Sequence, residues 1–311
     1  MRFPPPTDCT NRTSKPLGRP ASCRSTRPQT LMQQLAAVIG SPVRHSLSPA
    51  IHNAAFAHHG DAWVYLAFEV QPQHAAAAVD AMRVLGISGL SVTMPHKEMV
   101  LGALDDLSDD ARLVGAANTV VRDSSGRLIG HNTDGAGCVD ALQRAGADLG
   151  SVAVVGAGAT ARAVVVALVG AGASVGVVNR TAERRSIAVR IGNSVRSNST
   201  NAIEPEDLAA FPTIINTTPV GMHGLGADDH TKATPFDVSL LHTGQFVLDA
   251  VYHPLETTLL RAVRERGGTA VDGLEMLCAQ AARQQELWLG RRPDVAMMRA
   301  AALAELAASQ Q

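Results

Sequence analysis

The chain has 311 residues, of which 46% are hydrophobic and 3% aromatic, and this length predicts two domains with separate aliphatic cores. Its apolar runs are far shorter than the roughly 18 residues of a membrane-spanning helix, so we expect no membrane partner. The formal net charge is −1, and beyond residue 30 the chain carries 21 basic and 27 acidic residues, so it lacks the clustered positive charge that nucleic-acid binding needs.

Residues 1–30 hold six basic side chains and one acid, are rich in Pro, Ser and Thr, and show no apolar periodicity. This composition predicts a disordered N-terminal extension of residues 1–30. The segment lacks the apolar stretch of a secretory signal, whereas its arginines and serines are compatible with a transit peptide. Because the composition changes abruptly at Leu31, we expect the extension to be dispensable and Met32 to be the functional start.

The four cysteines show no spacing typical of a metal site, and we expect no metal. Cys9 and Cys23 lie in the extension. Cys138 and Cys278 fall in predicted helices, where they are expected to be small buried side chains rather than a disulfide. This cysteine usage fits a reducing, cytoplasmic location.

After the extension, strands and helices alternate. The predicted elements of the first part are strands at 35–39, 63–70 and 87–93, helices at 49–59 and 72–85, and a hairpin at 120–129. Strand, helix and strand in this order imply a parallel sheet.

Two serines flank the start of the first predicted helix. Ser48 is a plausible N-cap, with Pro49 at the first helical position. Ser46 and Ser48 together also suit a carboxylate, because two hydroxyls and the helix N-terminus favour an anion.

Two charged residues follow predicted strands. Lys97 lies just past the strand at 87–93, at the usual mouth of an α/β site, although a lone lysine there is more often an exposed helix-start residue. Asp134 begins a helix that is predicted to reach about Ala145, and capping that helix would explain it equally well.

Residues 152–163, VAVVGAGATARA, turn from a buried strand into a helix through glycines. Gly156, Gly158 and Ala161 have the GxGxxG/A spacing, in which the first glycine allows the turn and the second lets a pyrophosphate approach. The small third residue lets helix and strand pack closely. By itself this spacing is equally compatible with a structural turn.

The next strand, predicted at 173–178, ends in Asn179 and Arg180, where an NAD-binding unit usually has an acid for the ribose hydroxyls. Arg180 can lie against adenine and, with Arg184 or Arg185, meet a 2′-phosphate. The alternative is that Asn179 ends the strand and the arginines form a solvated helix face. The missing acid and the added cations favour NADP over NAD.

Nine motifs occur in one order over residues 36–290: HSLSP, SVTMPHK, GAANT, HNTDG, GAGATARA, NRT, NTTPVGM, DAVYHP and GLEMLCAQAA. Together they resemble the shikimate dehydrogenases, over nearly all of the chain except the extension and the last helix. The resemblance implies an enzyme that uses NADP(H) to reduce 3-dehydroshikimate reversibly to shikimate, a step toward aromatic amino acids. We expect a small-molecule substrate and a monomer or homodimer.

The resemblance also implies an α/β fold of two domains with the active site in the cleft between them. The substrate-binding domain is expected to be mainly parallel and to contain residues 31–133 and 273–311. Residues 134–272 are expected to form the Rossmann-like NADP-binding domain. The predicted elements of this second part of the chain are strands at 213–215 and 246–250 and helices at 275–289 and 295–306.

The resemblance also implies a role for each residue that matches a motif of the family. Lys97 and Asp134 are the expected catalytic pair, in which Lys97 supplies charge and a proton to a developing alkoxide and Asp134 orients it. The expected substrate-binding residues are Ser46, Ser48, Thr93, Asn118, Tyr252 and Gln280. The expected cofactor-binding residues are Gly156, Ala157, Gly158, Ala159, Thr160, Asn179, Arg180, Thr181, Arg184, Thr217 and Met222.

Two positions depart from the family pattern. Ser91 stands where an asparagine is usual, which shortens one substrate hydrogen bond or replaces it by water, and Ala159 stands where the phosphate loop often has a glycine. Ser91 leaves open a quinate/shikimate dehydrogenase of the same superfamily. A non-catalytic nucleotide or substrate sensor is a further alternative, against which the presence of both Lys97 and Asp134 argues.

Overall fold

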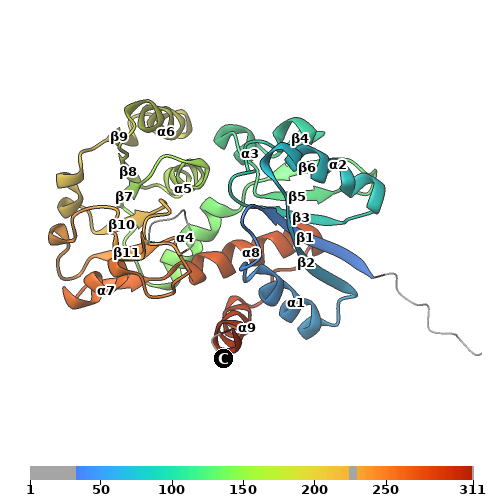
Figure 1. Cartoon of the computed structure of the whole chain (residues 1–311). Coiled ribbons are helices and arrows are strands. Elements are labelled where there is room, and N and C mark those ends of the chain that lie inside the picture. The colour runs from blue at the N-terminus through green and yellow to red at the C-terminus, as the bar shows by residue number, and fades with distance from the viewer. Residues whose placement is uncertain (1–32, 224–229, 310–311) are drawn as a thin grey trace, which may run out of the picture. The chain divides into compact units, whose positions relative to one another are not determined.

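The computed structural model describes residues 33–223 and 230–309, in two six-stranded sheets with helices around them (Figure 1). The predicted extension of residues 1–30, with Cys9 and Cys23, lies outside the described residues, as does Met32. Within the described part, no helix is long and apolar enough to cross a membrane.

The first sheet has the strand order β2-β1-β3-β5-β6-β4. Its strands are β1 (Gln34–Gly40), β2 (Trp63–Glu69), β3 (Gly89–Val92), β4 (Asp106–Leu107), β5 (Thr119–Arg122) and β6 (Leu128–His131). Only β5 runs antiparallel to its neighbours, so the sheet is mainly parallel, as predicted.

The reversal of β5 brings three chain segments together at one edge of this sheet. The Val92 N–H donates to the Asn118 carbonyl at 2.8 Å, and the Asn118 N–H donates to the His131 carbonyl at 3.0 Å. The start of β5 therefore lies beside the ends of β3 and β6, where the polar loops begin.

The helices of this part are α1 (Ser48–His59), α2 (Ala75–Leu85) and α3 (Asp109–Val114). The prediction that Ser48 is the N-cap of α1 is wrong. Leu47 occupies the cap position with near-helical backbone angles, so the helix begins one residue earlier than expected and has no side-chain cap. The Ser48 N–H instead donates to the Ser46 hydroxyl at 3.2 Å.

The second sheet is entirely parallel, in the order β12-β11-β10-β7-β8-β9. Its strands are β7 (Ser151–Val155), β8 (Ser174–Val178), β9 (Thr200–Ala202), β10 (Thr213–Asn216), β11 (Phe246–Asp249) and β12 (Thr269–Val271). The chain proceeds outward from β7 on one side and from β10 on the other, which is the order of a Rossmann sheet. Ligands bind such sheets where the order reverses, between β7 and β10.

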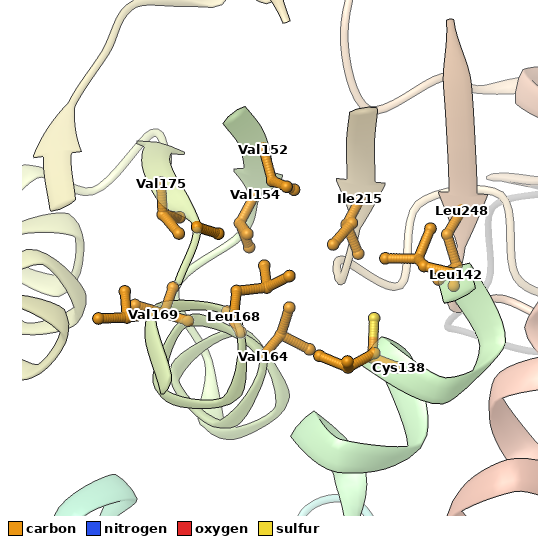
Figure 2. Close-up of a cluster of buried hydrophobic side chains, with 14 of the residues drawn as sticks. Cys138, Leu142, Val152, Val154, Val164, Leu168, Val169, Val175, Ile215 and Leu248 are labelled. Atoms are coloured by element: carbon orange, nitrogen blue, oxygen red, sulfur yellow. The ribbon is translucent and has the colours of Figure 1, made fainter. Parts of the chain in front are cut away.

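Helices α4 (Asp134–Arg144), α5 (Ala159–Gly170), α6 (Ala182–Val195) and α7 (Thr258–Glu265) accompany this second sheet. Figure 2 shows side chains of α4 and α5, including Cys138 and Leu168, pointing toward Val154 and Ile215 on the strands. Cys138 is buried and free, as predicted, and so is Cys278. The core rests on aliphatic residues, in keeping with the low aromatic content.

The last two helices, α8 (Gly273–Leu289) and α9 (Val295–Ala308), return to the first sheet (Figure 1). Cys278 of α8 and Met298 of α9 are buried in one apolar cluster with Ile51 of α1. The indole N–H of Trp288 donates to the Val120 carbonyl in β5 at 3.1 Å. Helix α8 therefore carries its side chains to the edge of the sheet where β5 begins.

Candidate active site

A cavity of about 260 Å³ lies beside the strand ends of both sheets. All eight residues expected to act on the substrate line it: Ser46, Ser48, Thr93, Lys97, Asn118, Asp134, Tyr252 and Gln280. Of the expected cofactor residues, Thr160, Thr217 and Met222 also line it. The others lie in the β7–α5 turn and after β8.

Lys97 and Asp134 form an ion pair in this cavity. The Lys97 ammonium donates to Asp134 Oδ2 at 2.5 Å, and the two side chains are 15% and 7% exposed. The main chain of Lys97 is held by the Ala117 N–H, which donates to its carbonyl at 2.9 Å. Burying two charged groups costs free energy, because both lose their hydration. An ion pair that lies in a cavity in spite of this cost is typical of a functional site.

Asp134 does not cap its helix, which rejects the capping alternative. Thr133 occupies the cap position of α4 without a side-chain bond, and Asp134 is the first helical residue. Its carboxylate accepts hydrogen bonds from the side chains of Lys97, Asn118 and Thr160. The helix start therefore directs the carboxylate into the cavity.

Asn118 holds the second oxygen of this carboxylate in one orientation. Its Oδ1 accepts from the Thr133 N–H at 2.8 Å and from the Thr119 hydroxyl at 2.8 Å. Because a backbone N–H can only donate, the amide nitrogen must face the other way, where it donates to Asp134 Oδ1 at 2.7 Å.

Thr160 is closer to Lys97 and Asp134 than its motif suggested. We expected it in the pyrophosphate cradle, and the structure places its hydroxyl 3.1 Å from both Lys97 Nζ and Asp134 Oδ2. Arg162 on the same helix donates to the Val114 carbonyl at 2.9 Å and to Glu98 at 2.7 Å. The start of α5 is thus tied to the loop that carries Lys97.

Tyr252 comes from the loop after β11. It lies near the Ser46 hydroxyl, and burial raises its pKa, so the phenol keeps its proton as a donor. Tyr252 lines the cavity and also packs against the apolar cluster that contains Cys278 and Met298.

Asp249, at the end of β11, joins the loops that follow β10 and β11. It accepts from Asn216 Nδ2 at 2.9 Å, from the Val251 N–H at 3.1 Å and from the Thr257 hydroxyl at 2.7 Å. Burial raises the pKa of Asp249, and these hydrogen bonds oppose the rise. Sequence reasoning assigned Asp249 no role, although it is the first residue of the DAVYHP motif.

Gln284 and Ser91 complete the polar wall of the cavity. Gln284 is 2% exposed and donates to the Thr119 hydroxyl at 3.0 Å. Sequence reasoning named Gln280 and missed Gln284, although residues four apart share a helix face, a spacing that points to it.

The β7–α5 turn has the geometry of a phosphate cradle. Gly156 has a φ of +117°, and a Cβ there would lie 2.4 Å from the Thr217 hydroxyl, so only glycine fits. A Cβ on Gly158 would meet no atom of the described chain within 4 Å, which leaves room for a ligand. The first α5 donor within the helix is the Arg162 N–H, so the N–H groups before it are available to an anion.

The end of β8 lies next to this turn, because the Gly156 N–H donates to the Val178 carbonyl at 2.8 Å. Asn179 Nδ2 donates to the Thr181 carbonyl at 2.9 Å, so Asn179 does shape the turn that ends the strand. Arg185 bonds Glu204 at 2.9 Å.

Arg180 and Arg184 are exposed and have no hydrogen-bond partner among the residues that the structure describes. Because Arg185 is already paired, Arg184 is the second cation open to a ligand beside Arg180.

Comparison with known proteins agrees with this geometry. Residues 38–120 match the family described as "Shikimate dehydrogenase substrate binding domain", and residues 273–303 match "Shikimate 5'-dehydrogenase C-terminal domain". A curated NADP(+)-dependent shikimate dehydrogenase of Symbiobacterium thermophilum is 43% identical over 284 residues, which cover 88% of this chain and 95% of the relative.

Two solved structures are similar over most of their length. Shikimate 5-dehydrogenase of Thermus thermophilus in complex with NADP(H) and shikimate has a TM-score of 0.80 at 34% identity, covering 87% of this chain and 99% of that one. Quinate dehydrogenase of Corynebacterium glutamicum in complex with NAD has a TM-score of 0.78 at 34% identity, covering 88% and 99%. With the fold, the motifs and these relatives in agreement, the chain belongs to the shikimate dehydrogenase family.

Proposed function

We propose that this chain catalyses the reversible, NADP(H)-dependent reduction of 3-dehydroshikimate to shikimate. The observation that carries the proposal is the Lys97–Asp134 pair, held in a cavity at the reversal point of a Rossmann sheet and bonded to Thr160 at the start of α5. The shikimate dehydrogenases among its relatives support the choice of substrate and cofactor.

The chemistry needs a hydride and a proton. NADPH, when bound, supplies the hydride to the ketone. Asp134 accepts hydrogen bonds from three donors, as an ionised carboxylate does, whereas Lys97 is the group with protons to give. Lys97 therefore protonates the developing alkoxide and takes the proton back in the reverse direction, while Asp134 holds its Nζ in place.

The substrate is held by the residues that line the cavity around this pair. Ser46, Ser48 and Tyr252 seat its carboxylate, because three hydroxyls converge beside the start of α1. Thr93, Asn118 and Gln280 bind its ring hydroxyls. Residues 31–133 and 273–311 are the proposed substrate-binding domain, and residues 134–272 are the proposed NADP-binding domain.

The cofactor residues fit NADP better than NAD. Gly156, Ala157, Gly158 and Ala159 hold the pyrophosphate at the start of α5, and Thr217 and Met222 reach the nicotinamide end. Arg180 and Arg184, with Asn179 and Thr181 beside them, bind the 2′-phosphate, since both guanidiniums are exposed and Asn179, rather than an acid, stands directly after β8. We also propose a cytoplasmic monomer or homodimer without a nucleic-acid partner.

Oxidation of quinate is the second candidate. Ser91 in the cavity wall departs from the usual asparagine, and a quinate dehydrogenase is among the similar structures. No contact of the described residues favours a sensor without catalysis.

Initial rates of reduced-cofactor formation test the proposal, with shikimate or quinate paired with NADP or NAD. We expect shikimate with NADP to exceed the other three pairings at least tenfold in kcat/KM. A preference for quinate would favour quinate oxidation, the second candidate. Absence of turnover in all four pairings would overturn both candidates.

A further inference from the structure

A directional chain of hydrogen bonds runs from the protein interior to Ser91 in the cavity wall. Gln284 Nε2 lies 3.3 Å from the Asn118 carbonyl and 3.0 Å from the Thr119 hydroxyl. A backbone carbonyl can only accept, so the amide nitrogen of Gln284 must face it and the amide oxygen must face away.

The amide oxygen of Gln284 lies 2.8 Å from the Ser91 hydroxyl. Because this oxygen can only accept, Ser91 donates its single proton to Gln284. The hydroxyl of Ser91 therefore has lone pairs to offer but no proton left.

Tyr65 occupies one of these lone pairs. Its hydroxyl is 2.6 Å from Ser91 Oγ and must be the donor, because the proton of Ser91 is already engaged. The side chain of Tyr65 is fully buried, and burial raises its pKa, so the phenol keeps this proton at any working pH.

The ring of Tyr65 is held in place from behind. The imidazole of His52 stacks on it at 4.2 Å between ring centroids with 9° between planes, and Gln285 Nε2 lies 3.0 Å from His52 Nδ1. Tyr65 thus has little freedom to turn its hydroxyl away from Ser91.

We propose that Tyr65 and Gln284 make Ser91 an obligate hydrogen-bond acceptor that selects a ring hydroxyl of the substrate. An asparagine at this position presents both a donor and an acceptor, whereas Ser91 accepts only. The inference rests on the proposed function and adds to it: Ser91 is a specificity residue, and Tyr65 is a positioning residue that acts through it. The hydroxyl in question is one of the two on ring carbons that do not react.

Fluorine tests the polarity of this contact, because it accepts hydrogen bonds weakly and cannot donate. We would measure competitive inhibition constants against shikimate for its 4-deoxy, 4-deoxy-4-fluoro, 5-deoxy and 5-deoxy-5-fluoro analogues. At the position that faces Ser91, deoxy and fluoro analogues should both bind about tenfold more weakly than the hydroxyl compound. Fluoro analogues that bind at both positions as well as shikimate itself would overturn the assignment.

Substitutions in the chain test whether Ser91 causes the weaker binding of these analogues. Ser91→Ala should reduce the penalty for removing that hydroxyl to less than about threefold. Gln284→Met has a similar length and removes the amide oxygen that accepts the Ser91 proton. Ser91 can then donate to fluorine, so the preference for hydroxyl over fluorine should fall at least threefold. A purely structural role of Gln284 would lower thermal stability and leave that preference unchanged.

Ser88→Ala is the matched control, because Ser88 is three residues before Ser91, bonds Gln34 and does not line the cavity. It should leave every inhibition constant unchanged. If the wild-type chain does not oxidise shikimate, the proposed function fails. Calorimetric dissociation constants for the same analogues then decide the acceptor assignment separately, and a lack of binding by shikimate overturns it.

Discussion

The proposed substrate side and the proposed nucleotide side of the molecule are built in opposite ways. On the substrate side, Asn118 and Gln284 are each 2% exposed, and their amide nitrogens donate to protein acceptors. On the nucleotide side, Arg180 and Arg184 are exposed, and the glycine turn leaves N–H groups unused.

Desolvation explains the difference. A buried polar group without a partner costs about 1–3 kcal/mol, so the buried amides of Asn118 and Gln284 are held in one orientation by protein partners. Exposed cations and helix-end N–H groups remain hydrated at little cost. The nucleotide side can therefore leave these groups without protein partners until an anion binds. We therefore expect substrate-side changes to alter catalysis and selectivity, and nucleotide-side changes to alter cofactor affinity.

Removing the ammonium from the pair should have the largest effect. Lys97→Ala should lower kcat by about 10²–10⁴-fold, the range for a positioned acid or base, and should leave the Kd for NADP within about threefold. Steady-state rates and fluorescence titration measure the two quantities. Lys232→Ala removes an exposed lysine outside the cavity as control. A loss confined to substrate KM would contradict a catalytic role.

Removing a cation from the nucleotide side should separate the two cofactors. Arg180→Ala should raise the KM for NADP about tenfold, because a charge-assisted hydrogen bond to phosphate is lost, and should change the KM for NAD much less. Arg190→Ala, an exposed arginine further along α6, is the control. Equal losses for both cofactors would rule out a contact to the 2′-phosphate.

Thr160 lies on the boundary between the two sides. Thr160→Val removes the hydroxyl that bridges Lys97 and Asp134, and it should lower kcat at saturating NADP about three- to tenfold. Thr160→Ser should restore most of it. If the cofactor Kd changed and kcat did not, the Thr160 hydroxyl would contact only the pyrophosphate and would have no role in catalysis.

His52 affects stability, because it is buried beneath the substrate side and stacks on Tyr65. Burial lowers the pKa of His52 from 6.5 to about 3 in the folded chain. Between these values the unfolded chain binds a proton that the folded chain excludes, so stability falls as pH drops below 6.5, by up to about 1.4 kcal/mol per pH unit.

Urea unfolding at several pH values between 7.5 and 5 measures this dependence. His52→Asn should be less stable at neutral pH and should show a shallower loss toward acid. His59→Asn, at an exposed position, should keep the wild-type slope. Parallel slopes for wild type and His52→Asn would mean that other groups account for the acid sensitivity.

Much of the fold could be predicted because its signals are local. Apolar runs located most of the longer strands and helices within a few residues, whereas the short elements β4, β9, β12, α3 and α7 were not predicted. The glycine turn after β7 followed from Gly156, whose φ of +117° no other residue adopts easily. The predicted cap of α1 was wrong by one residue. Ser48 and Leu47 are neighbours, and the backbone angles that make Leu47 the cap cannot be predicted from residue type.

Local patterns were enough to predict the α/β alternation, the order of the motifs and the lack of an acid directly after β8. Contacts between distant segments were needed to show that β5 runs antiparallel, that Thr160 bonds Lys97, and that Tyr65 and Gln284 fix the direction of the Ser91 hydroxyl. Tyr65 and Gln284 lie 26 and 193 residues from Ser91. Periodicity reports on neighbours along one element, whereas the direction of a hydrogen bond depends on which distant donors and acceptors folding brings within reach.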